Sequence, residues 1–368
     1  MAGSVYGKLF RISTWGESHG KGVGVVVDGC PAGLALGEAD VQRYLNRRKP
    51  GQSRFTTARG ESDSVEILSG VFEGKTTGTP ISMIVYNKDQ HSRDYDDIKD
   101  IYRPGHADIT FDSKYGFRDY RGGGRSSGRE TIARVAGGAV ACKILEELGI
   151  SVEAYTKSIG DISIDDSAID MSVCSTNAFY MPDAEAALKA EALADACRQE
   201  MDSMGGVVEC RVKGLMRGIG ETVFDKLDAN LAKAIMSIGA VKGFEIGEGF
   251  NSSLLRGSTD NDEFYMTSDS EIEKKTNHSG GVLGGMSDGS EVVLRAAFKP
   301  TPSIARAQNT VNRMGEDVSI EIKGRHDPLV VPRAVVVVET MTALTVLDLV
   351  LENMTSRLDK IKEFYYNK

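Results

Sequence analysis

Two histidines lie in short glycine-containing motifs that could support acid–base chemistry. His19 lies in GESHG (16–20), and His106 lies in RPGHAD (103–108). Histidine changes charge near neutral pH, and small neighbours let a ligand approach the backbone. These properties point to a functional His19. On the residues of this motif alone, a surface turn that happens to contain histidine is an equal alternative. For His106, the motif alone slightly favours a structural turn in which Asp108 hydrogen-bonds the imidazole.

A basic segment stands out in a chain that is acidic overall. Lys and Arg total 44, Asp and Glu total 53, and the net charge is −9. The segment 43–59 nevertheless has six basic residues and no acidic one: Arg43, Arg47, Arg48, Lys49, Arg54 and Arg59. Guanidinium groups bind phosphate and carboxylate bidentately, so the segment predicts an anion site. The alternative is a solvated helix face followed by a loop.

The strongest local signal is a glycine loop, RGGGRSSGRE (121–130), followed by an apolar helical pattern. Ser127 and Glu130 have the spacing of a capping box, which would fix the start of the helix. The loop would then present backbone N–H groups and the positive end of the helix dipole to an anion. A disordered RNA-binding arm is the alternative, but the acidic composition and the capped helix argue against it.

Three polar turns follow in the C-terminal half: NHSGGVLGG (277–285), KPTPS (299–303) and GRHDP (324–328). Together they offer glycine backbone, a lysine, hydroxyls and an Arg-His-Asp group, which suits the phosphate and ring of a flavin. The sequence has no clustered Cys/His or acidic metal motif, so no protein-held metal is expected.

These motifs must be positioned by many short strands and a few long helices. Helices are predicted over 38–48, 130–148, 184–204 and 228–238, and strands over 22–28, 64–72, 80–86, 207–212 and 292–298. Runs of strands between blocks of helix indicate an α+β fold, with a doubly wound sheet as the alternative. We expect one domain, 1–368, with mobile active-site loops near 86–100 and 258–276.

Composition limits the classes of protein that the chain could be. Five cysteines, Cys30, Cys142, Cys174, Cys197 and Cys210, form no C-x-x-C pair and are expected to be core residues in a reducing cytoplasm. The apolar stretch 334–351 contains Glu339 and Asp348, so it is predicted to be a buried helix rather than a membrane span. The acidic balance disfavours nucleic-acid and anionic-membrane partners. No signal peptide is evident in residues 1–14.

The order of the motifs resembles the chorismate synthase family. GESHG, RRxPGQS, RPGHAD, RGGGRSSxRE, NHxGGxxGG, KPTPS and GRHDP occur in register over nearly the entire chain. The resemblance implies a β-α-β sandwich of antiparallel sheets with helices between them. It also implies a lyase that removes the 3-phosphate and a C6 hydrogen from 5-enolpyruvylshikimate 3-phosphate by anti-1,4-elimination. That reaction requires reduced FMN without net redox change.

The resemblance also implies site residues. His19 would protonate the leaving phosphate and His106 the reduced flavin, each with a pKa near neutrality, while Asp327 would assist at flavin N5 and Ser18 and Ser127 would relay protons. The substrate or NADP ligands would be Arg48, Arg54, Arg129 and Arg134. The FMN contacts would be Arg125, Ser126, Ser127, Gly239, Ala240, Gly284, Lys299, Pro300, Thr301, Pro302, Ser303 and Arg325.

A homotetramer, a dimer of dimers, is implied as well. The electron source stays open: NADPH could reduce the flavin in the same chain, or an outside reductant could do so. The sequence has no G-x-G-x-x-G fingerprint in a βαβ unit that would settle the question. Two other classes remain as alternatives, an RNA-binding protein and a flavin- or nicotinamide-dependent oxidoreductase with net redox change.

Overall fold

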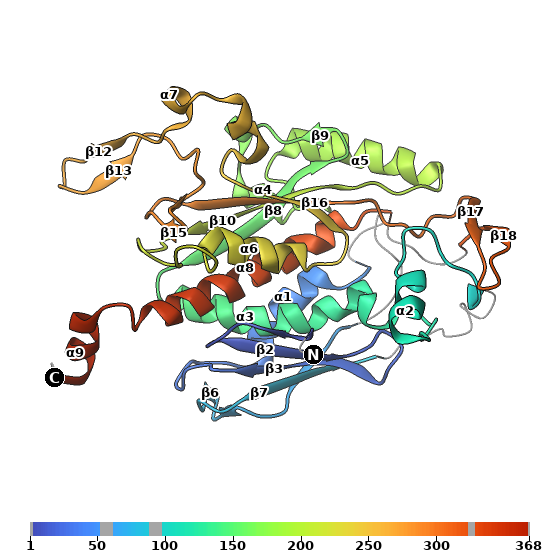
Figure 1. Cartoon of the computed structure of the whole chain (residues 1–368), viewed down its shortest axis with the longest axis horizontal. Coiled ribbons are helices and arrows are strands. Elements are labelled where there is room, and N and C mark those ends of the chain that lie inside the picture. The colour runs from blue at the N-terminus through green and yellow to red at the C-terminus, as the bar shows by residue number, and fades with distance from the viewer. Residues whose placement is uncertain (1–2, 52–61, 88–97, 323–327, 367–368) are drawn as a thin grey trace.

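Two antiparallel sheets face each other across a layer of helices (Figure 1). The computed structural model describes residues 3–51, 62–87, 98–322 and 328–366. The first sheet has the order β1 (Val5–Tyr6), β2 (Arg11–Gly16), β3 (Gly22–Asp28), β7 (Ile81–Tyr86) and β4 (Val65–Ile67). The second has the order β11 (Val241–Ile246), β16 (Val292–Phe298), β10 (Gly206–Lys213), β8 (Ser151–Ile159) and β9 (Ile162–Ser163). This confirms the α+β sandwich and not the doubly wound alternative.

The strand sequences explain which sheet faces are buried. Along β16, Val292, Leu294, Ala296 and Phe298 are buried, and the residues between them are partly exposed. In β7 the buried positions alternate in the same way. Because side chains alternate across a strand, this pattern turns one face of each sheet towards the helices. β3 is buried along most of its length, since its extra buried positions are Gly22 and Gly24, which have no side chain, and the Trp15 ring lies over Gly24.

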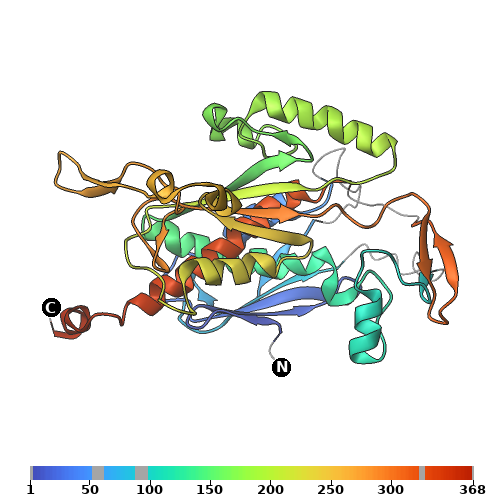
Figure 2. The same ribbon diagram turned by 45° about the horizontal axis from the view of Figure 1, so that its top comes forward.

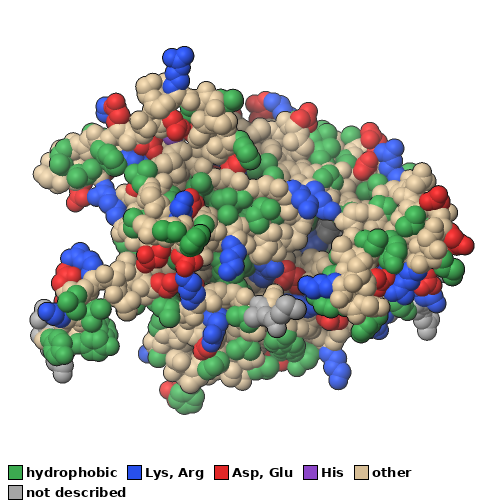
Figure 3. All heavy atoms as spheres, viewed as in Figure 1, with side chains coloured by type: hydrophobic (Ala, Val, Ile, Leu, Met, Phe, Trp, Pro, Cys, Tyr) green, Lys and Arg blue, Asp and Glu red, His purple; other side chains and the backbone are tan. Residues whose placement is uncertain are grey.

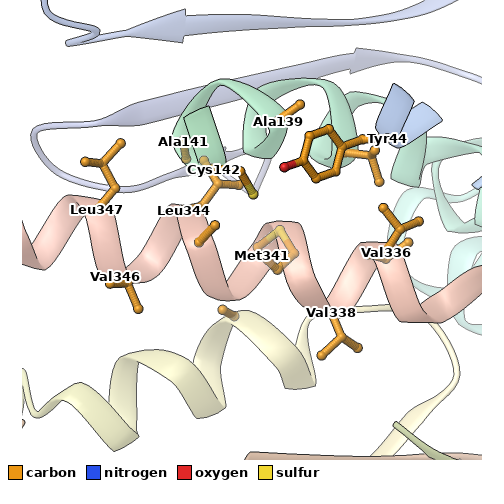
Figure 4. Packing of buried hydrophobic residues seen from close by; sticks show 14 of the residues in the cluster. Tyr44, Ala139, Ala141, Cys142, Val336, Val338, Met341, Leu344, Val346 and Leu347 are labelled. Atoms are coloured by element: carbon orange, nitrogen blue, oxygen red, sulfur yellow. The ribbon is translucent and has the colours of Figure 1, made fainter. Parts of the chain in front are cut away.

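Four helices form the central layer: α1 (Glu38–Arg48), α3 (Thr131–Glu147), α6 (Leu227–Met236) and α8 (Val331–Asn353). α3 packs on the first sheet, and α8 packs on α3 and on the second sheet. Figure 4 shows the contact, where Met341 and Leu344 of α8 lie close to Ala141 and Cys142 of α3. A single apolar cluster therefore contains residues of both sheets and of all four helices.

α8 is the one described helix that is long and apolar enough to cross a membrane, but 94% of its most apolar window is buried inside the fold. The prediction of a buried helix is confirmed. Its acidic residues have partners: Glu339 accepts from Arg47 at 2.6 and 2.9 Å, and Asp348 accepts from the backbone N–H groups of residues 8–10. All five cysteines are free and buried, as predicted.

The remaining elements lie around this sandwich. α5 (Ala184–Gln199) and α4 (Met171–Cys174) pack with a second apolar cluster over β8 and β9. α2 (Asp108–Tyr115) and the hairpin β17 (Gln308–Val311)–β18 (Asp317–Ile320) lie at one end of the molecule, whereas α9 (Leu358–Tyr366) lies at the other in both views (Figure 2). The short elements are η2 (Gly124–Ser126), η3 (Gly128–Glu130), η4 (Asp166–Ala168), η5 (Gly249–Leu254), α7 (Gly257–Asp260), β5 (Val71–Phe72), β6 (Lys75–Thr76), β12 (Phe264–Met266), β13 (Ile272–Lys274), β14 (Val282–Leu283) and β15 (Met286–Ser287).

Most predicted elements form, with differences at their ends. The helix over 38–48 and the strands over 22–28 and 292–298 have the predicted bounds. The helix predicted to reach 204 ends at Gln199, and the strand over 64–72 is divided into β4 and β5. The stretch 258–276 contains α7 and the β12–β13 hairpin, at the end of the molecule opposite α2 (Figure 1). Of the loop 86–100, residues 88–97 lie outside the described residues.

Candidate active site

His19 lies against the glycine loop. It is half-buried in the turn between β2 and β3. Gly122 has a φ of +64°, and a Cβ at this position would lie 2.5 Å from Nε2 of His19 and 2.9 Å from Oγ of Ser18. The Ser18 hydroxyl donates to the Gly122 carbonyl at 3.1 Å. The GESHG turn and the glycine loop, about 100 residues apart, therefore form one site.

Asn87, at the end of β7, holds this turn in place. Its amide Nδ2 donates to the carbonyl of Glu17 at 2.9 Å and to that of Gly20 at 2.8 Å. Its Oδ1 accepts from Nε of Arg129 at 2.5 Å. One amide thus links the His19 turn to an arginine that the family resemblance proposes as a ligand-binding residue.

Two of the predicted anion-binding arginines share one buried carboxylate. Arg48 donates to Oδ2 of Asp63 at 2.6 Å, and Arg129 donates to Oδ1 at 3.1 Å. The side chains of Arg48, Arg129 and Asp63 are 2%, 9% and 0% exposed. Buried charges are tolerated where they are paired, so Asp63 explains how the two guanidiniums lie side by side in the fold.

The glycine loop continues through η2 and η3 into α3. Arg125 donates to Oγ1 of Thr14 at 2.7 Å and to the Gly16 carbonyl at 3.2 Å, which ties the loop to β2. The Ser126 hydroxyl donates to the Gly123 carbonyl at 2.7 Å. The backbone of the loop is thus fixed next to His19.

The predicted capping box at the start of α3 is wrong. Ser127 caps the short η3 turn by accepting from the Arg129 N–H at 3.3 Å, and α3 begins at Thr131. The Glu130 carboxylate accepts from Nε of Arg134 at 2.8 and 3.0 Å instead of reaching back to the cap. A charged partner one helical turn ahead competes with the cap, because residues at i and i+4 lie on one face.

His106 is held by hydrogen bonds on both ring nitrogens. Nδ1 lies 3.0 Å from the Pro104 carbonyl, which only accepts, so Nδ1 carries the proton, and Nε2 lies 2.9 Å from Oγ of Ser303. Burial, with the nearby charges of Arg103 and Lys299, lowers the pKa of His106 from 6.5 to about 4. The expectation of a pKa near neutrality is therefore not met, since both effects disfavour the imidazolium.

The prediction that Asp108 hydrogen-bonds His106 is also wrong. Asp108 accepts from the Arg103 side chain at 2.7 and 2.8 Å and from the Arg103 N–H at 3.1 Å. Burial alone would raise the pKa of Asp108, but the Arg103 guanidinium outweighs it and the pKa lies below its ordinary value. The pair braces the turn that carries His106.

The KPTPS motif lies beside the His106 turn. Lys299 donates from Nζ to the Gly105 carbonyl at 2.9 Å, and a Cβ at Gly105 would lie 2.7 Å from Cβ of Pro302. Thr301 accepts at its carbonyl from the Ser203 hydroxyl at 2.6 Å, while its own Oγ1 is buried without a hydrogen-bond partner among the described residues. Pro300 lies against Gly205. The 299–303 segment thus packs directly against the turn that carries His106.

Gly239 and Ala240 join the same region, and Gly284 does not. The Lys299 N–H donates to the Ala240 carbonyl at 2.9 Å, just beyond the C-terminal end of α6. Gly284 lies in the β14–β15 turn, whose next residue, Gly285, accepts from the N–H of Leu227 at the other end of α6. Within this chain, Gly284 is therefore a helix length away from the other proposed FMN contacts.

Arg134 is engaged in packing between helices. Besides Glu130, it donates to Oγ of Ser237 at 2.6 Å and to the Ser237 carbonyl at 3.1 Å, at the end of α6. Cations at the C-terminal end of a helix are favourable. The remaining site predictions, Arg54, Arg325 and Asp327, lie outside the described residues. Among the residues that are described, no three His, Cys, Asp or Glu side chains are grouped to hold a metal.

The surface is hollowed next to this region. In the view of Figure 3, Lys and Arg side chains surround a hollow between the end of α6 and α2. The positive charge around this hollow would favour an anionic ligand there.

Asp63 and Asn87 were not identified from the sequence, and the contact of Gly122 with His19 was not predicted. Asp63 lies beyond the basic segment 43–59, and Asn87 follows the strand predicted over 80–86, so neither gives a local signal. Gly122 is the first glycine of a run of three, and that run was the only available indication that backbone space is needed here.

Comparison with known proteins agrees with the motif order. The profile of the family described as Chorismate synthase matches residues 10–351. Chorismate synthase of Lachnospira eligens is 67% identical over 99% of this chain and 100% of its own, and that of Chloroflexus aggregans is 54% identical over 97% and 98%. A crystal structure of chorismate synthase superposes with a TM-score of 0.77 at 31% identity, covering 98% of both chains. This chain belongs to the chorismate synthase family.

Proposed function

We propose that this chain converts 5-enolpyruvylshikimate 3-phosphate into chorismate and phosphate by anti-1,4-elimination. The observation that carries the proposal is the packing of His19 on Gly122, because it places a titratable ring at the arginine-rich loop 121–130. Membership of the chorismate synthase family and the matched motifs support it.

The substrate carries two carboxylates and a phosphate, so it needs a cluster of cations. Arg48 and Arg129 lie together on Asp63, and we propose that they, with Arg54 and Arg134, bind these anions or an NADP phosphate. Arginine is suited to this role because its planar fork matches carboxylate and phosphate oxygens. Arg134 would have to exchange its contacts with Glu130 and Ser237 to take part.

We assign the proton steps to the two histidines. His19, with Ser18 bonded to the same loop, protonates the departing phosphate. His106 is neutral at pH 7 because its pKa is lowered to about 4, so proton donation from it requires the negative charge of bound ligands to raise that pKa. Ser127 would relay protons, and Asp327 would assist removal of the C6 hydrogen.

The residues fit reduced FMN as the cofactor. Thr301 Oγ1 is a buried hydroxyl without a partner among the described residues, and Lys299 and Ser303 add polar groups in the same segment. We propose that the 125–127 turn, Gly239, Ala240, the 299–303 segment and Arg325 hold it. When bound, reduced FMN supplies electron density transiently to assist loss of phosphate. NADPH is proposed as one possible reductant.

A homotetramer is proposed as the assembly, in the cytoplasm and without nucleic-acid or membrane partners. The position of Gly284 supports a multi-chain site, because a second copy would have to supply this residue to an FMN held near Gly239. Exposed apolar side chains on the projecting elements β12 and α9 also favour association: Phe264, Met266, Phe364 and Tyr365 are at least 60% exposed. Sedimentation at the mass of one chain would contradict this assembly.

An anaerobic assay with the substrate and chemically reduced FMN tests the function. We expect chorismate and phosphate in equal amounts, without net oxidation of the flavin. Repeating the assay with oxidised FMN and NADPH tests whether the chain also reduces its flavin. Consumption of reductant in a fixed ratio to product would show an oxidoreductase instead of a lyase. The absence of product under either condition would contradict both functions.

A further inference from the structure

We infer that Gly122 is a positioning residue that sets where the imidazole of His19 lies in the active site. Its importance for catalysis rests on the proposed function, but its contact with His19 does not. No side chain fits between the backbone at 122 and the ring, since a Cβ there would overlap Cδ2 and Nε2 of His19.

The requirement is specific to the first of three consecutive glycines. Gly122, Gly123 and Gly124 all have a positive φ, of +64°, +79° and +52°. A Cβ at Gly123 would approach no closer than 3.4 Å, to Oγ of Ser126, and one at Gly124 no closer than 4.0 Å, to Oε2 of Glu17. Backbone conformation favours glycine at all three positions, whereas contact with His19 requires it only at the first.

Both sides of this contact are held in place. On the loop side, Arg125 donates to Oγ1 of Thr14 at 2.7 Å and to the Gly16 carbonyl at 3.2 Å, which anchors the loop to β2. On the His19 side, Asn87 binds the carbonyls of Glu17 and Gly20, and Ser18 donates across the contact to Gly122. With both backbones fixed, a methyl group at 122 would displace the imidazole rather than the loop.

The experiment compares Gly122→Ala with Gly116→Ala. Gly116 also has a positive φ, of +80°, but a Cβ there meets nothing within 4 Å, so this variant carries the backbone strain without the clash. Each purified full-length variant is checked for folding by circular dichroism. The His19 imidazole is then titrated by NMR, with its signal among the five histidines assigned from its absence in His19→Gln, and the pH dependence of kcat is measured.

In Gly122→Ala, we expect a changed His19 shift and titration midpoint and a kcat about 100-fold lower, because displacement by about 1 Å costs that much in a positioned site. Gly116→Ala should keep the wild-type titration and pH profile.

If Gly122→Ala does not fold, Ser18→Ala, which removes the hydroxyl bonded to Gly122, should move the His19 signal in the wild-type fold. An unchanged His19 signal and kcat in Gly122→Ala would overturn the inference. A wild-type enzyme without lyase activity would instead reject the proposed function, while the NMR titration would still test the contact.

Discussion

His106 and Ser303 meet in the fold at 2.9 Å between Nε2 and Oγ, although nearly 200 residues separate them in the chain. Because Nδ1 donates to the Pro104 carbonyl, the neutral ring accepts the Ser303 hydroxyl at Nε2. The bond joins the RPGHAD turn to the KPTPS segment. It also fixes which nitrogen of His106 faces the proposed flavin contacts.

The low pKa of His106 makes folding stability depend on pH. The folded pKa is about 4 and the unfolded value is 6.5, so between these values the unfolded chain binds one more proton. Stability is fully retained above pH 6.5 and falls as the pH drops towards 4. Between pH 6.5 and 5, the free energy of unfolding should therefore fall by about 1–2 kcal/mol less in His106→Gln than in wild type. Urea unfolding of both proteins at these two pH values measures the difference, and identical losses would contradict the shift.

Asp63 should be needed to keep Arg48 and Arg129 together. Asp63→Asn keeps the shape but leaves two buried cations with a neutral partner, so we expect a loss of about 3 kcal/mol. Phosphate should then stabilise the variant more than it stabilises wild type, because the anion replaces the missing charge. Thermal unfolding with and without phosphate tests both effects. The control is Asp28→Asn, whose pair with Arg11 is about half exposed and should matter little. Equal losses of stability in the two variants would show that the shared buried carboxylate contributes no more than an exposed one.

Arg47 and Arg43 lie on the same helix and pair with different acids. Arg47 binds Glu339, which is 7% exposed, whereas Arg43 binds Glu146, which is 50% exposed. Arg47→Ala should cost about 2–4 kcal/mol because it leaves a buried carboxylate without this partner. Arg43→Ala should cost under about 1 kcal/mol. Urea denaturation measures the loss of unfolding free energy in each variant. A similar loss in both would contradict the expectation that the more buried ion pair matters more.

Gly138 sets the spacing between α3 and α8. A Cβ there would lie 2.6 Å from the Thr340 carbonyl oxygen and would also overlap Cβ of Thr340. Gly138→Ala should therefore destabilise the protein by about 2 kcal/mol, although alanine favours helix. Gly37→Ala, where a Cβ meets nothing, should change stability by less than about 1 kcal/mol. A Gly138→Ala protein as stable as wild type would show that the helices can separate at little cost.

Local sequence rules predicted the elements better than the contacts between them. The bounds of α1 follow from acidic residues in its first turn, arginines in its last turn and Pro50 just beyond. The α5 helix ends earlier than expected because Met201 adopts a positive φ of 58°. The capping box failed because Glu130 has a stronger partner in Arg134, which only the folded helix brings into reach.

The candidate site was predictable in its motifs but not in its pairings. The glycine loop and His19 do meet, and His106 does meet the KPTPS segment. The pairing of Asp63 with both arginines could not be predicted, because ion pairs between distant segments depend on tertiary packing. For the same reason the low pKa of His106 was missed, since it arises mainly from burial.

The most direct test of the central claim is the kcat of His19→Gln in the anaerobic assay with saturating reduced FMN. If His19 protonates the departing phosphate, kcat should fall by about 100-fold or more while FMN affinity, measured by equilibrium titration, stays the same. His106→Gln, measured in parallel, tests the second proton step. Turnover of His19→Gln close to that of wild type would contradict the account.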